Sequence, residues 1–370
     1  MAPIRLGVIG LSANGGWAAT SLIPPIFEPL LADKYKLTAL CTSSEESAKE
    51  AATKYTTIAG HPVKGYFGSQ GYRDIANDPE VDMVVVSVKI EEHAEPVLAT
   101  IEAGKMLFVE WAPGKNLEET VKLAEAAKAK GVRSLVGTQG AYAAYPKKVK
   151  EIIDSGKIGR VLSTSLSGAG PYGGGISIPA MSRVFDINNG LTLLTVPIGH
   201  FLIILKDVLG TFTEVTALGS IRFPIVQVIG GEPITDRTTH DQVIVTGVLK
   251  SNVGTAHDGV VVNIHYQGGV VTHEPFLWSI FGETGTIEVK AAKDAPGDVM
   301  PTQEKDVYLN GVKVEVEETE VDKKLGNTGK GWLEFAEQSG RGVSLEDSVE
   351  LYRVVDAALT SIREGRKVVL

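Results

Sequence analysis

The 370-residue chain has little of what marks several large classes of protein. Its single cysteine, Cys41, rules out a disulfide within the chain. Its 36 basic residues are scattered among 45 acidic ones, and the net charge of -9 argues against direct binding to nucleic acid or anionic membranes. We identify no apolar run of the roughly 18 residues that span a bilayer, and the N-terminal MAPIRLGVIG does not have the pattern of a signal peptide. We therefore expect a cytoplasmic or nuclear protein whose partner is a small molecule.

What is present suffices for a large core. Hydrophobic residues make up 43% of the chain and charged residues 22%, which is typical of a globular protein and excludes disordered, collagen-like and coiled-coil chains. Because domains usually run to about 100–200 residues, this length predicts two of them.

Residues 1–138 alternate short apolar runs with amphipathic stretches. Runs rich in Val, Leu and Ile predict strands over residues 4–9, 36–41, 81–88, 106–111 and 132–136. Between them, Leu117–Lys130 predicts a helix that begins at the N-cap Asn116 and ends at Gly131. This alternation is typical of a parallel, doubly wound α/β sheet, so we predict a Rossmann-type dinucleotide-binding domain.

Residues 139–370 have a different pattern. After a helix over residues 146–154, strands without regular helices between them are expected over residues 161–167, 212–221, 242–249, 259–266, 277–281 and 286–289. A buried helix is expected within residues 188–209, and a last helix from Ser344 that ends at Gly365 and packs back on the first domain. We predict an α+β domain with a large, mostly antiparallel, open-faced sheet.

The first strand leads directly into Gly10-Leu11-Ser12-Ala13-Asn14-Gly15-Gly16-Trp17. Dinucleotide folds need glycine at this turn because the backbone must approach the pyrophosphate closely. Gly10 matches the first glycine of the pattern, Ser12 takes the place of the second, and either Gly15 or Gly16 serves as the third.

The end of the second strand distinguishes NAD from NADP. A carboxylate there would bind the ribose 2′-hydroxyl of NAD and repel the 2′-phosphate of NADP. Thr42, Ser43 and Ser44 offer hydroxyls instead, so we predict NADP, with NAD as the alternative because no arginine is present to pair with the phosphate.

Several segments share a pattern with one enzyme family: Gly10 with Ser12 and Gly16, residues 81–86, residues 103–110, residues 155–159, Gly199-His200 and residues 282–286. On these the chain resembles the glucose-fructose oxidoreductase and inositol dehydrogenase family over nearly its whole length. Residues 16–18, 109–112 and 185–190 resemble most the branch of the fungal galactose-pathway co-repressor. The resemblance implies a Rossmann domain followed by an open-faced sheet domain, with the nicotinamide in the cleft between them.

Two positions depart from the family pattern. Family enzymes usually follow the glutamate, here Glu110, with a lysine that hydrogen-bonds the reacting hydroxyl, but this chain has Trp111 at that position. They also usually place an aspartate four residues before the histidine, here His200, but this chain has Val196 there. Losing the lysine removes a charge where an alkoxide develops, a contribution of about 3 kcal/mol in other enzymes. His200 remains, and a neutral imidazole with a pKa of about 6.5 can take the hydroxyl proton.

The candidate site residues follow from these patterns. We predict His200 as the catalytic residue and expect His93 on a helix surface. The predicted cofactor-binding residues are Gly10, Ser12, Asn14, Gly15, Gly16, Trp17, Thr42, Ser43, Ser44, Val88, Glu110 and Trp111. The predicted substrate-binding residues are Tyr142, Tyr145, Tyr172, Arg183 and Asp186. We predict no metal site, because the seven histidines are isolated in the sequence.

We therefore interpret the chain as an NAD(P)-dependent oxidoreductase that moves a hydride to or from a hydroxyl or carbonyl compound less polar than a simple sugar. Two alternatives stay open: a non-catalytic, dinucleotide-sensing co-repressor-like protein, and an enzyme of this fold turned to isomerisation, elimination or cyclisation. The lack of obvious long insertions favours an enzyme over a regulator. The apolar, alternating segment Val260–Tyr266 would leave one sheet face uncovered, which predicts a homo-oligomer, a dimer.

Overall fold

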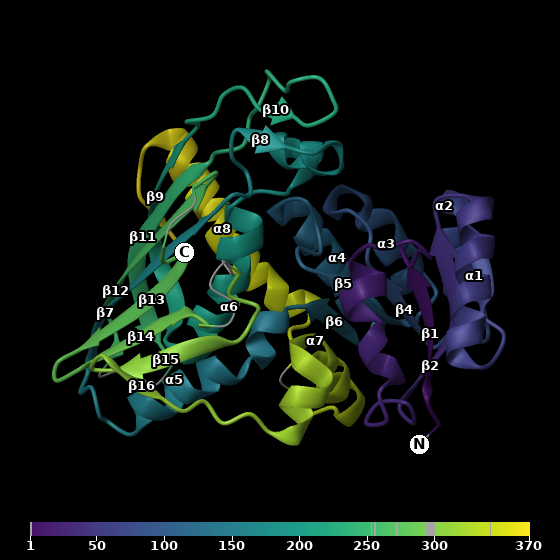
Figure 1. The fold of residues 1–370 in the computed structure, drawn as a ribbon, viewed down its shortest axis with the longest axis horizontal. Coiled ribbons are helices and arrows are strands. Elements are labelled where there is room, and N and C mark those ends of the chain that lie inside the picture. The colour runs from purple at the N-terminus through teal and green to yellow at the C-terminus, as the bar shows by residue number, and fades with distance from the viewer. Residues whose placement is uncertain (1, 253, 255–256, 271–272, 294–299, 341) are drawn as a thin grey trace. The chain divides into compact units, whose positions relative to one another are not determined.

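The computed structural model describes residues 2–252, 254, 257–270, 273–293, 300–340 and 342–370, which form two compact units (Figure 1). The first comprises Met1–Thr138 and Thr319–Glu350, and the second comprises Gln139–Glu318 and Leu351–Leu370. Residues 319–350, which the sequence analysis placed in the second domain, thus belong to the first unit.

The first unit is built on a six-stranded parallel sheet with the strand order β3-β2-β1-β4-β5-β6. The strands are β1 (Ile4–Ile9), β2 (Tyr35–Thr42), β3 (Lys64–Phe67), β4 (Met83–Val86), β5 (Met106–Glu110) and β6 (Ser134–Gly137). The order reverses where β1 pairs with β4, and sheets of this kind bind ligands beyond the carboxyl ends of their strands at that point. The predicted Rossmann-type fold is confirmed.

Helices connect these strands: α1 (Glu45–Ala59), α2 (Gly68–Asn77), α3 (Ala94–Glu102) and α4 (Leu117–Lys130). Helix α4 has the predicted ends, because the Asn116 side chain accepts a hydrogen bond from the Glu119 N–H at 2.9 Å and Gly131 ends the helix at φ 63°. Between β1 and β2, in place of a regular helix, lie the short η1 (Ala18–Leu22) and η2 (Pro24–Phe27), where consecutive prolines lack the N–H groups that would continue a helix.

Helix α7 (Glu320–Glu337) joins the core of the first unit. The buried Trp332 donates from its indole to the Leu22 carbonyl oxygen at 2.8 Å and stacks on Phe108 with ring centroids 4.9 Å apart. The Tyr35 hydroxyl in turn donates to the Trp332 carbonyl oxygen at 2.7 Å. The sequence analysis predicted no helix here; glycines interrupt its pattern, and Gly326 breaks it with a φ of 58°.

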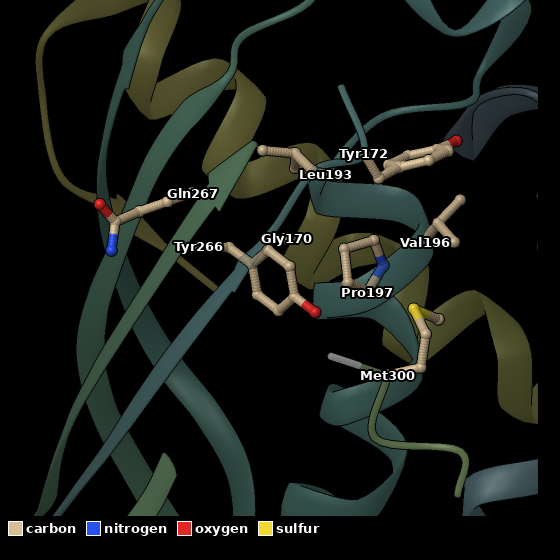
Figure 2. A pocket seen from close by; sticks show the side chains of 8 residues that line it. All are labelled: Gly170, Tyr172, Leu193, Val196, Pro197, Tyr266, Gln267 and Met300. Carbon is tan, nitrogen blue, oxygen red and sulfur yellow. The ribbon is translucent and has the colours of Figure 1, made fainter. Parts of the chain in front are cut away.

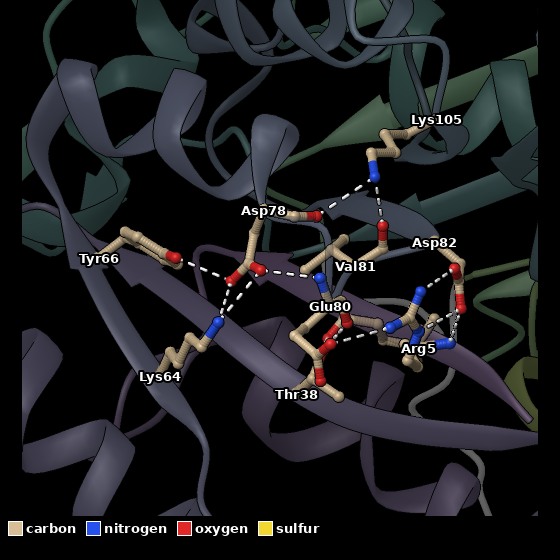
Figure 3. Close-up of polar contacts among 10 residues, drawn as sticks. Arg5, Thr38, Lys64, Tyr66, Asp78, Glu80, Val81, Asp82 and Lys105 are labelled. Carbon is tan, nitrogen blue, oxygen red and sulfur yellow. Dashed lines mark hydrogen bonds and ion pairs between the residues drawn. The ribbon is translucent and has the colours of Figure 1, made fainter.

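A polar cluster lies at the amino ends of the strands of this sheet, the edge opposite the one where ligands bind (Figure 3). The buried carboxylate of Asp78 accepts hydrogen bonds from Lys64 Nζ at 2.9 Å, from the Tyr66 hydroxyl at 2.8 Å and from the Glu80 N–H at 2.8 Å. Burial by itself would raise the pKa of Asp78, but these hydrogen bonds hold that pKa below its ordinary value. The cluster therefore stabilises the turns that precede β3 and β4.

Changing Asp78 to asparagine is expected to lower the free energy of unfolding by about 2 kcal/mol at pH 7, because hydrogen bonds to a charged acceptor are replaced by bonds to a neutral one. A carboxyl whose pKa is lowered in the folded state loses its stabilising effect as the pH falls through that pKa. In urea unfolding, the difference between wild type and Asp78→Asn should therefore shrink below about pH 4. The control is Asp74→Asn, an exposed carboxylate that accepts one hydrogen bond, from Gln70. A difference that stayed constant down to pH 3 would contradict this role.

The second unit contains a nine-stranded sheet with the order β16-β15-β14-β13-β7-β12-β11-β9-β17. Its pairs are antiparallel except for β12 with β7, so the predicted fold class is confirmed. The strands are β7 (Val161–Gly170), β9 (Gly210–Ser220), β11 (Gln242–Ser251), β12 (Val260–Gly268), β13 (Phe276–Gly282), β14 (Thr286–Ala291), β15 (Lys305–Leu309), β16 (Val312–Val314) and β17 (Val368–Val369). A separate small sheet pairs β8 (Ile176–Ser177) with β10 (Gln227–Val228).

Helices pack on one face of the large sheet. They are α5 (Ala144–Asp154) and α6 (Gly199–Val208), the second preceded directly by the π-helical turn η7 (Leu194–Ile198). Phe201 of α6 meets Trp278 of β13 edge to face, with ring centroids 5.2 Å apart. Within residues 187–208, a window of 18 residues has a mean hydropathy of 1.6, which is long and apolar enough to cross a membrane, and 78% of that window is buried inside the protein.

The last helix, α8 (Leu345–Glu364), begins after the cap that the sequence predicts, in which the Ser344 side chain and Asp347 hydrogen-bond each other. Its residues from Leu351 onward belong to the second unit, where the Ser361 hydroxyl accepts a hydrogen bond from the Ala217 N–H of β9 at 2.9 Å. Residues 345–350 of the helix group with the first unit.

Candidate active site

The glycine loop after β1 has the backbone that a dinucleotide requires. Gly10 has a φ of 94°, and a Cβ atom there would collide with the Ser87 carbonyl oxygen, so only glycine fits. Gly15 and Gly16 have φ values of 133° and 90°, but a Cβ atom on either would meet nothing within 4 Å. The loop therefore leaves open space beside these two glycines, which fits the close approach of a pyrophosphate.

Side chains hold this loop in shape. The Ser12 hydroxyl donates to the Gly15 carbonyl oxygen at 2.9 Å and accepts from the Asn14 N–H at 3.3 Å. Asn14 donates to the Glu50 carboxylate of α1 at 3.1 Å, and Lys54 of α1 donates to the Ala13 carbonyl oxygen at 2.6 Å. Ser12 thus stands where the usual pattern has its second glycine, and its side chain holds the loop by hydrogen bonds within it.

The loop is also joined to the end of β5. The Trp17 indole donates to Glu110 Oε1 at 2.8 Å, while 43% of the Trp17 side chain stays exposed. A Cβ atom on Gly137 of β6 would crowd the Glu110 carboxyl group, so glycine is needed at that position. Trp111, the residue after β5, is 5% exposed. Glu110 therefore braces the loop, and its carboxylate faces the edge of the sheet where ligands bind.

Two of the three hydroxyl residues at the end of β2 form hydrogen bonds that shape the start of α1. Ser44 is the N-cap of α1 and accepts from the Ser47 N–H at 3.3 Å, and the Thr42 hydroxyl donates to the Ser44 carbonyl oxygen at 3.2 Å. Ser43 is exposed, and the first turn of α1 brings two acidic residues, Glu45 and Glu46. Buried Cys41 has its pKa raised to about 12 by burial, which makes its thiol unreactive.

His93 is a residue that the sequence analysis misjudged. It is buried, 1% exposed, rather than lying on a helix surface. Its Nδ1 lies 2.9 Å from the Ala112 carbonyl oxygen and its Nε2 lies 3.2 Å from the Val88 carbonyl oxygen. Burial lowers the pKa of His93. The imidazole thus ties together the segments that follow β4 and β5. The position of His93, just after a strand end and at the start of a helix, was the sequence feature that could have indicated this structural role.

The twelve predicted cofactor residues all lie at the carboxyl ends of β1, β2, β4 and β5. Three contacts bring these strand ends together. Trp17 donates a hydrogen bond to Glu110, and the Gly10 N–H donates to the Cys41 carbonyl oxygen at 2.8 Å. Gly10 also lies close to the Val88 side chain. The first unit therefore offers one continuous set of groups for a dinucleotide.

In the second unit, His200 lies in the first turn of α6 and is 8% exposed. Burial lowers its pKa to about 4, instead of the ordinary value of about 6.5 expected from the sequence. At pH 7 the imidazole is therefore neutral and able to accept a proton.

The predicted substrate residues differ in their surroundings. Tyr145 is fully buried and its hydroxyl donates to the Pro301 carbonyl oxygen at 2.8 Å, a structural contact. Asp186 caps the short turn η6 (Ile187–Asn189) by accepting from the Asn188 N–H at 3.0 Å. Arg183 lies in η5 (Pro179–Phe185) and Tyr142 in η4 (Gln139–Tyr142). Only Tyr172 of the five lines the cavity described next.

A cavity of about 200 Å³ lies within the second unit (Figure 2). The residues that line it are Gly170, Tyr172, Leu193, Val196, Pro197, Tyr266, Gln267 and Met300. Val196 and Pro197 belong to η7, the turn that leads into His200. Burial raises the pKa of Tyr172 to about 12, so its phenol stays neutral at pH 7. The sequence analysis noted Val196 only as a missing aspartate and did not predict the cavity.

Within the described ranges, no group of three His, Cys, Asp or Glu side chains is arranged to hold a metal ion.

Comparison with known proteins assigns both units. Residues 4–138 match the model described as "Oxidoreductase family, NAD-binding Rossmann fold", and residues 145–291 match "Gal80p, C-terminal domain". Dehydrogenase aclE of Aspergillus oryzae is 32% identical over 98% of this chain and 97% of its own length.

Two solved structures have the same fold. A super-repressor mutant of Gal80p from Saccharomyces cerevisiae has a TM-score of 0.84 at 21% identity, covering 100% of this chain and 99% of its own. Levoglucosan dehydrogenase in complex with NADH and L-sorbose has a TM-score of 0.77 at 18% identity, covering 100% and 99%. The chain belongs to the oxidoreductase family with an NAD-binding Rossmann fold, in the branch that carries a Gal80p-like C-terminal domain.

Proposed function

We propose that the protein is an NAD(P)-dependent oxidoreductase that interconverts a secondary alcohol and a ketone, or a hydroxyl and carbonyl group of similar chemistry, on a compound less polar than a simple sugar. The observation that carries the proposal is the glycine loop: the open backbone at Gly15 and Gly16, braced by Ser12 and by the Trp17 to Glu110 hydrogen bond, fits a dinucleotide pyrophosphate. A dinucleotide held by this loop would supply hydride-transfer chemistry.

His200 would accept the proton of the hydroxyl group as the hydride leaves, so that the alcohol loses one hydride and one proton and becomes a carbonyl compound. This imidazole is neutral at pH 7, as a proton acceptor must be, and its pKa of about 4 makes it a weak base. Trp111, in place of a lysine, provides no positive charge for a developing alkoxide and would instead form an apolar wall beside the nicotinamide. Both assignments are part of the proposal.

NADP is the proposed cofactor, with NAD as the alternative. The absence of a carboxylate over residues 42–44 favours NADP, whereas Glu45 and Glu46 in the next turn disfavour a 2′-phosphate. Calorimetric titration with NADP⁺ and NAD⁺ measures the preference. Absorbance at 340 nm, followed with a panel of cyclic alcohols, ketones and sugars, measures turnover. Failure of both dinucleotides to bind would contradict the proposal, and binding without turnover would favour a dinucleotide-sensing regulator like Gal80p.

A dimer is also proposed. The face of the large sheet that carries no helix has exposed apolar side chains on three strands, with Leu218 66%, Val261 54% and Phe281 42% exposed. Apolar area of this kind is usually covered by a symmetric partner. Light scattering at micromolar concentration should give twice the chain mass of 39.3 kDa, and Val261→Lys with Leu218→Lys should return the monomer mass. A wild-type monomer would refute this expectation.

A further inference from the structure

The cavity of the second unit is lined mostly by apolar groups from several segments. Val196 and Pro197 come from η7, Tyr266 from β12, and Met300 from the chain just before β15. Figure 2 shows the ring of Tyr266, the ring of Tyr172 and the side chain of Met300 around the same space. Its volume of about 200 Å³ is somewhat larger than a cavity of about 150 Å³ known to hold benzene in another protein.

Glycines and a buried ion pair set the shape of this cavity. Gly168 lies opposite Tyr266 in the register of β7 and β12, and a Cβ atom at Gly168 would collide with the Tyr266 ring. The guanidinium of Arg237, paired with Asp241 at 3.4 Å, donates to the Gly173 carbonyl oxygen at 2.7 Å. Both side chains of this pair are almost fully buried. The glycine-rich segment after β7 is therefore fixed next to Tyr172, which argues that the cavity is preformed.

Val196 lies in the wall of this cavity, four residues before His200. A valine cannot hydrogen-bond a hydroxyl group, and a hydroxyl that is buried without a hydrogen-bond partner loses the favourable hydration it had in water. A hydroxyl on a bound ring that points at Val196, Pro197 or Leu193 is therefore penalised, whereas bare CH₂ groups there gain from leaving water.

We propose that this cavity binds one uncharged six-membered carbon ring of the substrate, and that Val196 is the residue that selects such a ring over a polyol. The inference rests on the proposed function in that the ring belongs to the alcohol or ketone that is turned over. It names a substrate class, a hydrophobic cyclic alcohol or ketone, for the cavity lined by the turn that leads into His200.

Cyclohexanol and myo-inositol test the proposal because they share a ring and differ in five hydroxyl groups. Saturation-transfer NMR on the full-length protein, without cofactor, measures both dissociation constants. Cyclohexanol should bind with a dissociation constant in the millimolar range or below, at least about 100-fold more tightly than myo-inositol. Equal affinities, a preference for myo-inositol, or no binding of cyclohexanol would overturn the proposal.

Two substitutions locate the binding. Val196→Phe should fill the cavity and weaken cyclohexanol binding at least about tenfold, and Val196→Asp should weaken it similarly by placing a polar group in an apolar space. Val312→Asp, at a position 69% exposed in β16, is the matched control and should leave binding unchanged. Urea unfolding of each variant shows that it is folded. Cyclohexanol binding that is unaffected in a folded Val196→Phe variant would overturn the proposal.

The cyclohexanol experiment and the test of the proposed oxidoreductase activity can fail independently. Cyclohexanol binding that depends on Val196, together with no NAD(P)-linked turnover of any alcohol or ketone, would leave this inference standing and reject the oxidoreductase. NAD(P)-linked turnover of an apolar acyclic alcohol or ketone with no cyclohexanol binding would do the reverse.

Discussion

Substituting Gly10 with alanine is expected to lower the free energy of unfolding by about 3 kcal/mol and to weaken dinucleotide binding at least about tenfold. The residue follows β1, and Ser87 follows the neighbouring β4, so the two backbones meet at the point where the strand order reverses. A methyl group there must displace the Ser87 carbonyl oxygen, and the φ of 94° is itself unfavourable for alanine. Urea unfolding and calorimetric titration with NADP⁺ measure the two effects.

Two other glycines separate these causes. Gly60 ends α1 at φ 70° with nothing near its missing side chain, so Gly60→Ala should cost about 1 kcal/mol of stability and leave dinucleotide binding unchanged. Gly16→Ala should cost a similar amount but weaken binding, because its methyl group would project into the space assigned to the pyrophosphate. If Gly10→Ala behaved like Gly60→Ala, the loop would not be the dinucleotide site.

Secondary structure could be predicted from the sequence where the local pattern of residues agrees with the burial in the fold. The parallel sheet could be predicted because strands such as Met83–Val86 are apolar on both faces, and α4 because Asn116 and Gly131 are a standard N-cap and C-cap. The edge strand β3 was missed because Lys64–Phe67 is short, mostly exposed and contains a glycine. Strands β15 and β16 escaped prediction for similar reasons, being short and separated only by Asn310 and Gly311.

The site was less accessible to sequence reasoning because its properties depend on long-range packing. The cofactor loop could be located from Gly10 and Gly16, since the backbone there is determined by the residues themselves. The bridge made by His93 and the apolar cavity at Val196 depend on segments far apart in the chain, which no periodicity reports. The pKa of His200 was misjudged for the same reason, because burial in α6 is a tertiary property.

Changing His200 to alanine should reduce alcohol oxidation by a factor of about 100 or more while leaving dinucleotide affinity unchanged, if this imidazole is the proton acceptor. With a pKa lowered to about 4, the neutral form required for oxidation persists as the pH falls from 7 to 5. The value of kcat/KM for oxidation should therefore stay level over that range and decline only as the pH falls through about 4. At pH 7 only about one molecule in a thousand carries the protonated form, so carbonyl reduction should accelerate as the pH is lowered.

The matched control for the histidine is His200→Gln, which keeps a polar side chain of similar size in α6 but cannot accept a proton near neutral pH. If His200 transfers the proton, the glutamine variant should be as inactive as the alanine variant, and neither should show the acid limb near pH 4. If His200 only supports the packing of α6, the glutamine variant should recover most of the activity that alanine loses, with the wild-type pH profile. That second result would assign proton transfer to another group, and the Tyr172 phenol, neutral at pH 7 and lining the cavity, would be the next residue to replace.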